Sequence, residues 1–113
     1  MRAFALLAAA LAATSVAGAQ DEVRIELTAE KFHFGTQEIR LKKDRRVTIV
    51  LTSPDYAHGF AVPDLGVRGD AIPGKRVEIT FIPDRAGRFR FLCDNFCGED
   101  HDSMAGMLVV ADD

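Results

Sequence analysis

The 113-residue sequence has no tryptophan, one tyrosine and only two cysteines, and no stretch with helical periodicity extends beyond a turn or two. It also has no internal repeat, low-complexity tract or linker, so a helical bundle or a second domain is not expected. Charge of one sign is not in large excess, because the formal net charge is −3. A mildly acidic chain has no electrostatic reason to bind nucleic acid or an anionic membrane surface, and neither is expected as a partner.

Long apolar segments are confined to the N-terminus. Arg2 precedes an alanine-rich run from Ala3 to Ala19, which ends in the small residues Ala17-Gly18-Ala19. This order is typical of a secretory signal peptide. We expect residues 1–19 to be removed as a signal peptide, leaving residues 20–113 as a single domain in the periplasm or outside the cell, with no membrane span. The alternative is an uncleaved anchor facing the periplasm, because the run reaches the lower end of the roughly 17–25 residues that can cross a bilayer.

The rest of the chain alternates between short apolar stretches and turns. Apolar and polar residues alternate, or β-branched residues cluster, at 23–27, 38–42, 47–51, 77–81, 88–91 and 107–110. Four prolines, from Pro54 to Pro83, lie nine or ten residues apart between these stretches. Short strands with breaks at this spacing indicate an all-β fold, a small Greek-key β-sandwich.

One segment concentrates metal-binding side chains. Cys93, Cys97, His101 and Met104 follow the spacing C-x3-C-x3-H-x2-M within twelve residues, after the stretch containing Phe91. Alternation along that strand directs Cys93 toward the apolar side, and the residues after it form a polar loop that can wrap around one point. His58 follows a buried strand and is expected at the same end of the sandwich. Met107 in the last strand is expected in the core, and His33 on the solvent side.

These ligand types favour copper. Thiolates and a thioether are soft and imidazole is borderline, which suits copper better than a hard cation. His58, Cys97, His101 and Met104 would form a mononuclear blue-copper site, and the surplus Cys93 thiol points to two coppers bridged by two thiolates. Two alternatives remain. One is a structural disulfide between Cys93 and Cys97, and the other is zinc bound by both cysteines and both histidines.

The loop resembles the copper-binding loop of the CuA domains of cytochrome c oxidase subunit II and nitrous oxide reductase. The segment Ser53-x-Asp55-x-x-His58 and the stretch from Asp64 to Gly74 also resemble those domains. The resemblance implies a cupredoxin fold and one-electron transfer. It also implies two coppers per chain, bridged by Cys93 and Cys97, with His58 and His101 as terminal ligands and with Met104 and the Asn95 backbone carbonyl as weak ligands.

The chain departs from the oxidase pattern at two points. Oxidase subunits usually have a glutamate where this chain has Asn95, and the tryptophan associated with electron entry into the oxidase is missing. A backbone ligand survives the first change. We therefore do not expect an ordinary oxidase subunit.

We expect an electron carrier rather than an enzyme, because no nucleophile–base pair or acid–base dyad is evident. Its partner would be a redox protein such as a c-type cytochrome or an oxidase, and we expect a monomer. Glu99, Asp100 and Asp102 form an acidic rim beside His101 that could dock a basic cytochrome. The alternative is a copper-handling protein, namely a store, sensor or carrier that supplies an oxidase through the same ligands.

Overall fold

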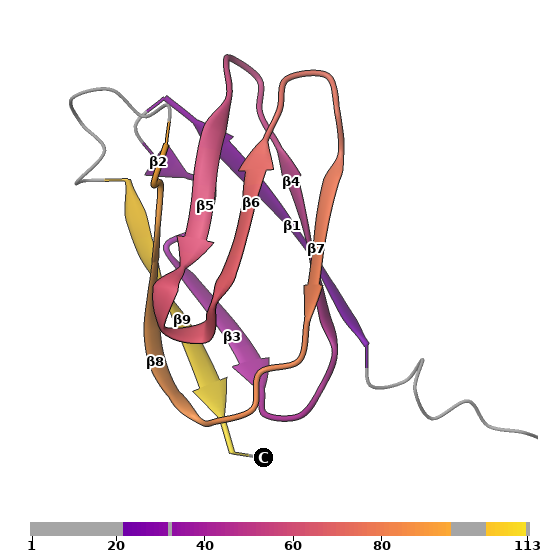
Figure 1. Ribbon diagram of the computed structural model, residues 1–113, viewed down its shortest axis with the longest axis vertical. Coiled ribbons are helices and arrows are strands. Elements are labelled where there is room, and N and C mark those ends of the chain that lie inside the picture. Colours follow the sequence, from indigo (N-terminus) through magenta and orange to yellow (C-terminus); the bar gives the residue numbers. More distant parts are fainter. Residues whose placement is uncertain (1–21, 32, 96–103, 113) are drawn as a thin grey trace, which may run out of the picture.

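The structure is a computed structural model and describes residues 22–31, 33–95 and 104–112. The described chain forms two β-sheets packed face to face (Figure 1). The first sheet has the order β2-β1-β4-β7, and the second has the order β3-β9-β8-β5-β6. The strands are β1 (Val23–Glu30), β2 (His33–Phe34), β3 (Glu38–Lys42), β4 (Val47–Thr52), β5 (His58–Val62), β6 (Val67–Ala71), β7 (Val77–Phe81), β8 (Gly87–Leu92) and β9 (Ala105–Ala111), and the 3-10 helix η1 (Pro63–Leu65) joins β5 to β6.

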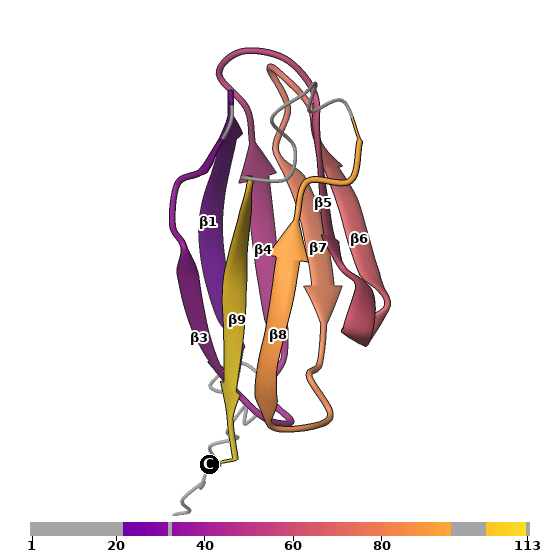
Figure 2. The same cartoon turned by 90° about the vertical axis from the view of Figure 1, so that its left-hand side faces the viewer.

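Both sheets combine antiparallel and parallel pairs. β1 pairs in parallel with β4, and β3 pairs in parallel with β9. The remaining neighbours, including β8 and β9 side by side in Figure 2, are antiparallel. Because the parallel pairs join strands that are distant in sequence, the chain crosses between the sheets, as in a Greek-key sandwich. The prediction of an all-β sandwich is confirmed.

An aromatic cluster lies in the core between the sheets. Phe34, Phe60 and Phe91 are almost completely buried, with ring centroids 5.2–5.8 Å apart. Fully burying one such side chain contributes about 1.5–3 kcal/mol. Since side chains alternate along a strand, the inward direction of Phe60 and Phe91 also directs His58 and Cys93, each two residues away, to the inner side.

All six predicted strands are present, and three strands were missed. β2 has only two residues, β5 begins at His58, and β6 has the sequence Val-Arg-Gly-Asp-Ala without clear alternation. One side-chain prediction was wrong: Met107 is only half-buried, because β9 turns Leu108 and Val110 into the core instead. Val23, the first residue of β1, is exposed. His33 lies on the solvent side as predicted.

Among the described residues, no helix has the length and apolar character needed to cross a bilayer. The predicted signal peptide, residues 1–19, lies outside the described residues.

Candidate metal centre

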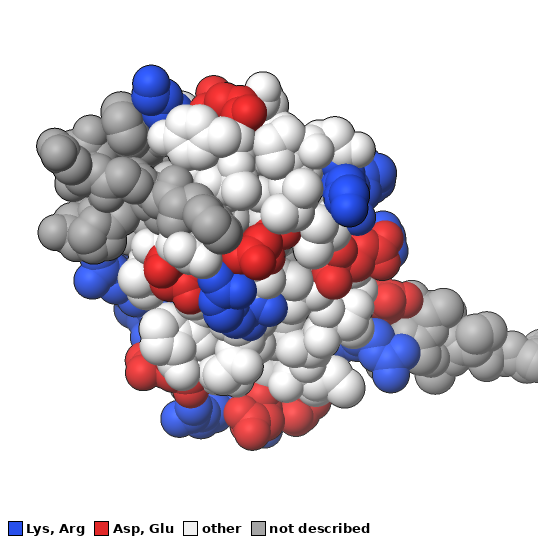
Figure 3. All heavy atoms as spheres, turned by 45° about the horizontal axis from the view of Figure 1, so that its top comes forward, with Lys and Arg blue, Asp and Glu red and all other residues white. Residues whose placement is uncertain are grey.

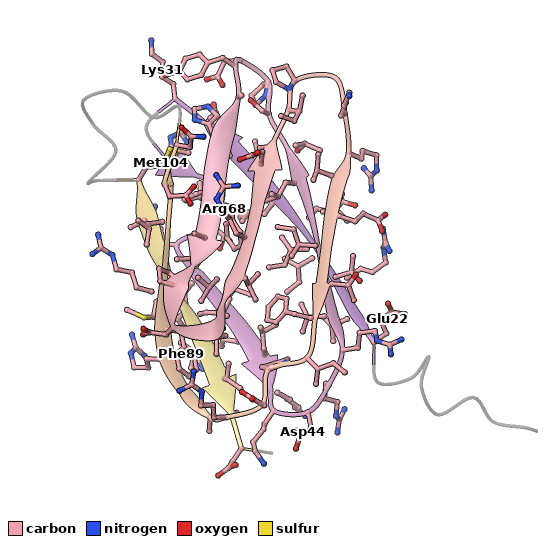
Figure 4. All side chains as sticks on the ribbon, viewed as in Figure 1. Glu22, Lys31, Asp44, Arg68, Phe89 and Met104 are labelled. Carbon is pink, nitrogen blue, oxygen red and sulfur yellow. The ribbon has the colours of Figure 1, made fainter. Side chains whose placement is uncertain are left out.

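Three of the predicted ligand residues meet at one end of the sandwich. His58 is the first residue of β5, Cys93 directly follows β8, and Met104 directly precedes β9. All three are 0% exposed. Figure 4 shows Met104 at the upper end of the molecule, on the side of Lys31 and far from Asp44. Cys97 and His101, together with the acidic rim of Glu99, Asp100 and Asp102, lie outside the described residues.

One ring nitrogen of His58 has a hydrogen-bond partner, and the other has none among the described residues. Its Nε2 lies 2.8 Å from Oδ1 of Asp55. Its Nδ1 is completely buried and has no hydrogen-bond partner among the described residues. A buried polar nitrogen without a partner is costly, and native proteins keep few of them. A histidine that contacts a carboxylate through one nitrogen and is free at the other has the arrangement typical of a metal ligand.

Asp55 organises the turn between β4 and β5. Its carboxylate accepts hydrogen bonds from the backbone N–H groups of Lys31 at 2.7 Å and Tyr56 at 2.6 Å, and from the Ser53 hydroxyl at 3.1 Å. Burial raises the pKa of the Asp55 carboxyl, but these hydrogen bonds and the one to His58 outweigh it and hold the pKa well below its usual range. Asp55 therefore stays ionised at neutral pH and fixes the orientation of the His58 ring.

Cys93 joins the predicted metal-binding loop to the second sheet. Its backbone N–H donates to the carbonyl of Met104 at 3.0 Å, so the two ends of the loop are tied together. Its sulfur lies 3.2 Å from the backbone carbonyl oxygen of Asn95. The structure contains Cys93 in a disulfide, so this sulfur has no proton to donate and the approach is a contact rather than a hydrogen bond. The oxidised sulfur cannot bind copper as a thiolate, so the disulfide and copper states are alternatives.

Gly59 holds the start of the loop against β5. Its N–H donates to the Asn95 carbonyl at 2.9 Å. A Cβ at this position would lie 2.1 Å from Oδ1 of Asp94 and 2.9 Å from the Asn95 nitrogen, so a glycine is needed for this close approach. This contact fixes the same carbonyl that the resemblance assigns as a weak copper ligand.

Arg68 of β6 reinforces this contact from the neighbouring strand (Figure 4). Its guanidinium forms a bidentate pair with Asp94, at 2.6 and 2.9 Å, and also contacts Asp70 at 2.9 Å. Hydrogen bonds to both carboxylates raise the pKa of Arg68 further above its usual range. The three partly exposed groups form a network of opposite charges beside the loop, which holds Asp94 in place.

The described donors fit a copper site in part. Cys93, Met104 and the free Nδ1 of His58 are soft or borderline donors, as copper prefers. No group of three or more His, Cys, Asp or Glu side chains converges on one point within the described part of the chain. The predicted set requires Cys97 and His101, whose positions stay a prediction.

Sequence reasoning did not assign roles to Gly59, Arg68, Asp94 or Tyr56. Asp55 was noted only within a resembling segment. The Arg68–Asp94 pair spans 26 residues, and no periodic pattern marks such a pair. A glycine directly after a candidate histidine was the one visible signal, because it permits close approach of another chain segment.

Comparisons with known proteins agree with the fold. Residues 22–111 match the family of the cytochrome c oxidase subunit II periplasmic domain. The chain is 32% identical over 93 residues to nitrous-oxide reductase of Cupriavidus necator, covering 79% of this chain and 14% of that protein. It is also 32% identical over 81 residues to cytochrome c oxidase subunit 2 of Thermus thermophilus, covering 70% of this chain and 60% of that protein.

Among solved structures, the periplasmic domain of cytochrome oxidase subunit II from Bradyrhizobium japonicum superposes with a TM-score of 0.71 and 25% identity. The superposition covers 80% of this chain and 84% of that domain. The sandwich is thus cupredoxin-like, as the resemblance implied. The chain spans about one seventh of the nitrous-oxide reductase it matches and less than two thirds of the Thermus subunit. This chain therefore belongs to the family of the cytochrome c oxidase subunit II periplasmic domain.

Proposed function

We propose that the chain is a periplasmic copper protein that transfers single electrons through a dinuclear centre of the CuA type. The ligands would be the thiolates of Cys93 and Cys97, the imidazoles of His58 and His101, the Met104 thioether and the Asn95 backbone carbonyl. When bound, the copper pair supplies a site that accepts and releases one electron. Family membership and the donors of the described residues support this proposal.

The buried Nδ1 of His58 carries the proposal. It has no hydrogen-bond partner among the described residues, although Nε2 of the same ring is held by a carboxylate. If neither a metal ion nor a hydrogen-bond donor is bound to this nitrogen, its burial carries an uncompensated desolvation cost of about 1–3 kcal/mol. A metal ion at Nδ1 removes that cost, and Asp55 at Nε2 fixes the tautomer that leaves Nδ1 free to bind.

The protein's own residues keep such a site rigid and dry. Asp55 orients the His58 ring, and Gly59 and Arg68 hold the Asn95 carbonyl and Asp94 in place. His58, Cys93 and Met104 are shielded from water. Little rearrangement on gaining or losing an electron favours rapid transfer, and a metal carrier would instead need accessible ligands that release their ion. We therefore favour electron transfer over the copper-handling alternative.

Location and partner follow from the same reasoning. The matched family is a periplasmic domain, which supports placement in the periplasm. We propose that residues 1–19 are removed as a signal peptide. A c-type cytochrome or an oxidase would exchange electrons with the protein. Nitrous-oxide reductase is an enzyme, but this chain matches only 14% of it, and we propose that the present domain transfers electrons without catalysing a reaction of its own.

Copper loading tests the proposal. The protein is first reduced, because the Cys93 disulfide must be opened to give thiolates, and copper is then added and its amount per chain measured. We expect two coppers per chain, a purple colour, and a multi-line EPR spectrum from one unpaired electron shared by the pair. His58→Ala should abolish this spectrum, whereas the matched variant His33→Ala should retain it. One copper per chain with a four-line blue spectrum would refute the dinuclear centre.

A further inference from the structure

Tyr56 combines exposure with direct contact to the site. Among the described residues, the exposed large hydrophobic side chains are Val23, Tyr56 and Ile82. Val23 is paired with Val47, which is in turn paired with Phe81, so Val23 and Ile82 lie at the end opposite His58. Tyr56 is therefore the exposed member of this group at the site end, within the part of the chain that the structure describes.

The Tyr56 ring covers the ring of His58. The two rings are stacked, with centroids 4.6 Å apart and an interplanar angle of 29°. Tyr56 is 39% exposed, whereas His58 is 0% exposed. A protein arriving at this face cannot touch the imidazole, but it can touch the aromatic ring stacked on it.

The position of Tyr56 is fixed at its backbone as well as its ring. Its N–H donates to Oδ1 of Asp55 at 2.6 Å, and its carbonyl accepts a hydrogen bond from the Ser53 hydroxyl. The same Oδ1 atom contacts His58 Nε2. The Asp55 carboxylate therefore holds both the backbone of Tyr56 and the ring of His58, the two residues of the stack.

We propose that Tyr56 is the residue through which electrons pass between a redox partner and His58, which rests on the proposed role of His58 as a copper ligand. In each transfer, one electron would leave the ferrous haem of a cytochrome, whose iron would become ferric, pass through the Tyr56 and His58 rings by tunnelling, and reduce the oxidised copper pair by one electron. No bond forms or breaks, no proton moves, and Tyr56 is not itself oxidised. This supplies an aromatic route in a chain that has no tryptophan.

The surface around this end suits a partner with an exposed haem edge. Figure 3 brings the end forward and shows uncharged surface flanked by groups of acidic and basic side chains. Aromatic residues with apolar bodies and polar tips are common anchors of interfaces, and charges around them set orientation. The partner is thus a haem protein whose haem edge is surrounded by apolar atoms, which can stack against Tyr56.

Rates of electron transfer test the proposal. Copper-loaded wild type, Tyr56→Phe, Tyr56→Leu and the control Ile82→Ala are mixed with a ferrous c-type cytochrome in a stopped-flow spectrometer. The copper spectrum and reduction potential of each variant are recorded first. We expect Tyr56→Leu to react about tenfold or more slowly, as for the loss of an interface anchor, and both Tyr56→Phe and Ile82→Ala to react at the wild-type rate. A Tyr56→Leu variant with an intact copper spectrum and an unchanged rate would refute the proposal while leaving the proposed function standing.

A second measurement detects contact with the partner and does not depend on the rate of electron transfer. Because Tyr56 is the chain's only tyrosine, protein labelled at the tyrosine ring gives signals from this residue alone. These signals should shift or broaden when the cytochrome is added to fully reduced, copper-loaded protein. Unchanged ring signals under conditions in which the two proteins react would overturn the proposal even if Tyr56→Leu failed to load copper. Failure of the wild type to bind two coppers would instead overturn the proposed function.

Discussion

Replacing Gly59 with alanine tests the contact that holds the loop against β5. The new Cβ would lie 2.1 Å from Oδ1 of Asp94 and 2.9 Å from the Asn95 nitrogen, whereas ordinary contacts begin near 3.4 Å. The Asp94 carboxylate would have to move by more than about 1 Å, given the usual carbon contact distance of about 3.5–4.0 Å. That movement breaks the bidentate pair with Arg68 and displaces the Asn95 backbone.

The expected size of the effect follows from three contributions. Overpacking costs about 1–3 kcal/mol, and loss of the partly exposed Arg68–Asp94 pair costs about 0–1 kcal/mol. Against this, alanine is favoured over glycine within a strand by roughly 0.5–1 kcal/mol. The net loss is therefore between about 0 and 3.5 kcal/mol, centred near 2 kcal/mol, and each kcal/mol lowers the Tm of a domain of this size by about 4–8 °C.

The assay compares thermal unfolding and copper affinity of Gly59→Ala with those of Gly35→Ala. A Cβ at Gly35 would meet Thr28 at an ordinary distance of 3.5 Å, so this control makes the same chemical change without the clash. Adding Asp94→Ala to Gly59→Ala should restore part of the loss, because it removes the nearest clashing atom. If Gly59→Ala unfolds at the wild-type Tm and binds copper with wild-type affinity, the reasoning about this contact is wrong.

The remaining predictions concern the ligands and Asp55. Cys93→Ser should abolish the two-copper spectrum because a bridging thiolate has no substitute. Met104→Leu should keep both coppers and shift mainly the reduction potential, since an axial thioether binds weakly. Met107→Leu serves as a control that should change neither the copper content nor the potential. If metal analysis and voltammetry showed that Met104→Leu loses copper while Cys93→Ser keeps both coppers, the ligand roles would be wrong. Asp55→Asn should weaken copper binding about 10–100-fold by releasing the His58 ring, as measured by competition with a chelator. The folded-state pKa of Asp55 is depressed, so its stabilising effect is present above the ordinary value of about 3.9 and is lost as pH falls through the folded-state pKa. In metal-free protein, the Tm difference between wild type and Asp55→Asn should therefore stay constant from neutral pH down to about pH 4 and shrink below it, and a difference that stays constant at still lower pH would contradict this account.

Much of the architecture could be predicted because it depends on local patterns. Alternation over five or six residues shows which side chains a strand buries, and it correctly placed Phe89, Phe91 and Cys93 on the inner side. The spacing of Cys93, Cys97, His101 and Met104 shows donor chemistry without any knowledge of the fold. Strands β5 and β6 were missed because one carries the candidate histidine among apolar residues and the other has a glycine and two charges, so neither alternates.

The sequence by itself determined the strands with alternating side chains, the copper-type donors, and the placement of His58 near the metal-binding loop. Only the tertiary structure decided which atoms meet there. The pairing register of β5 with β6 and β8 brings Gly59 under Asn95 and Arg68 beside Asp94, and the turn after β4 stacks Tyr56 on His58. Such contacts join residues up to 36 positions apart, as for Gly59 and Asn95. The Gly59–Asn95 and Arg68–Asp94 contacts arise from the packing of whole strands, because a change of register by one residue would place different residues opposite one another.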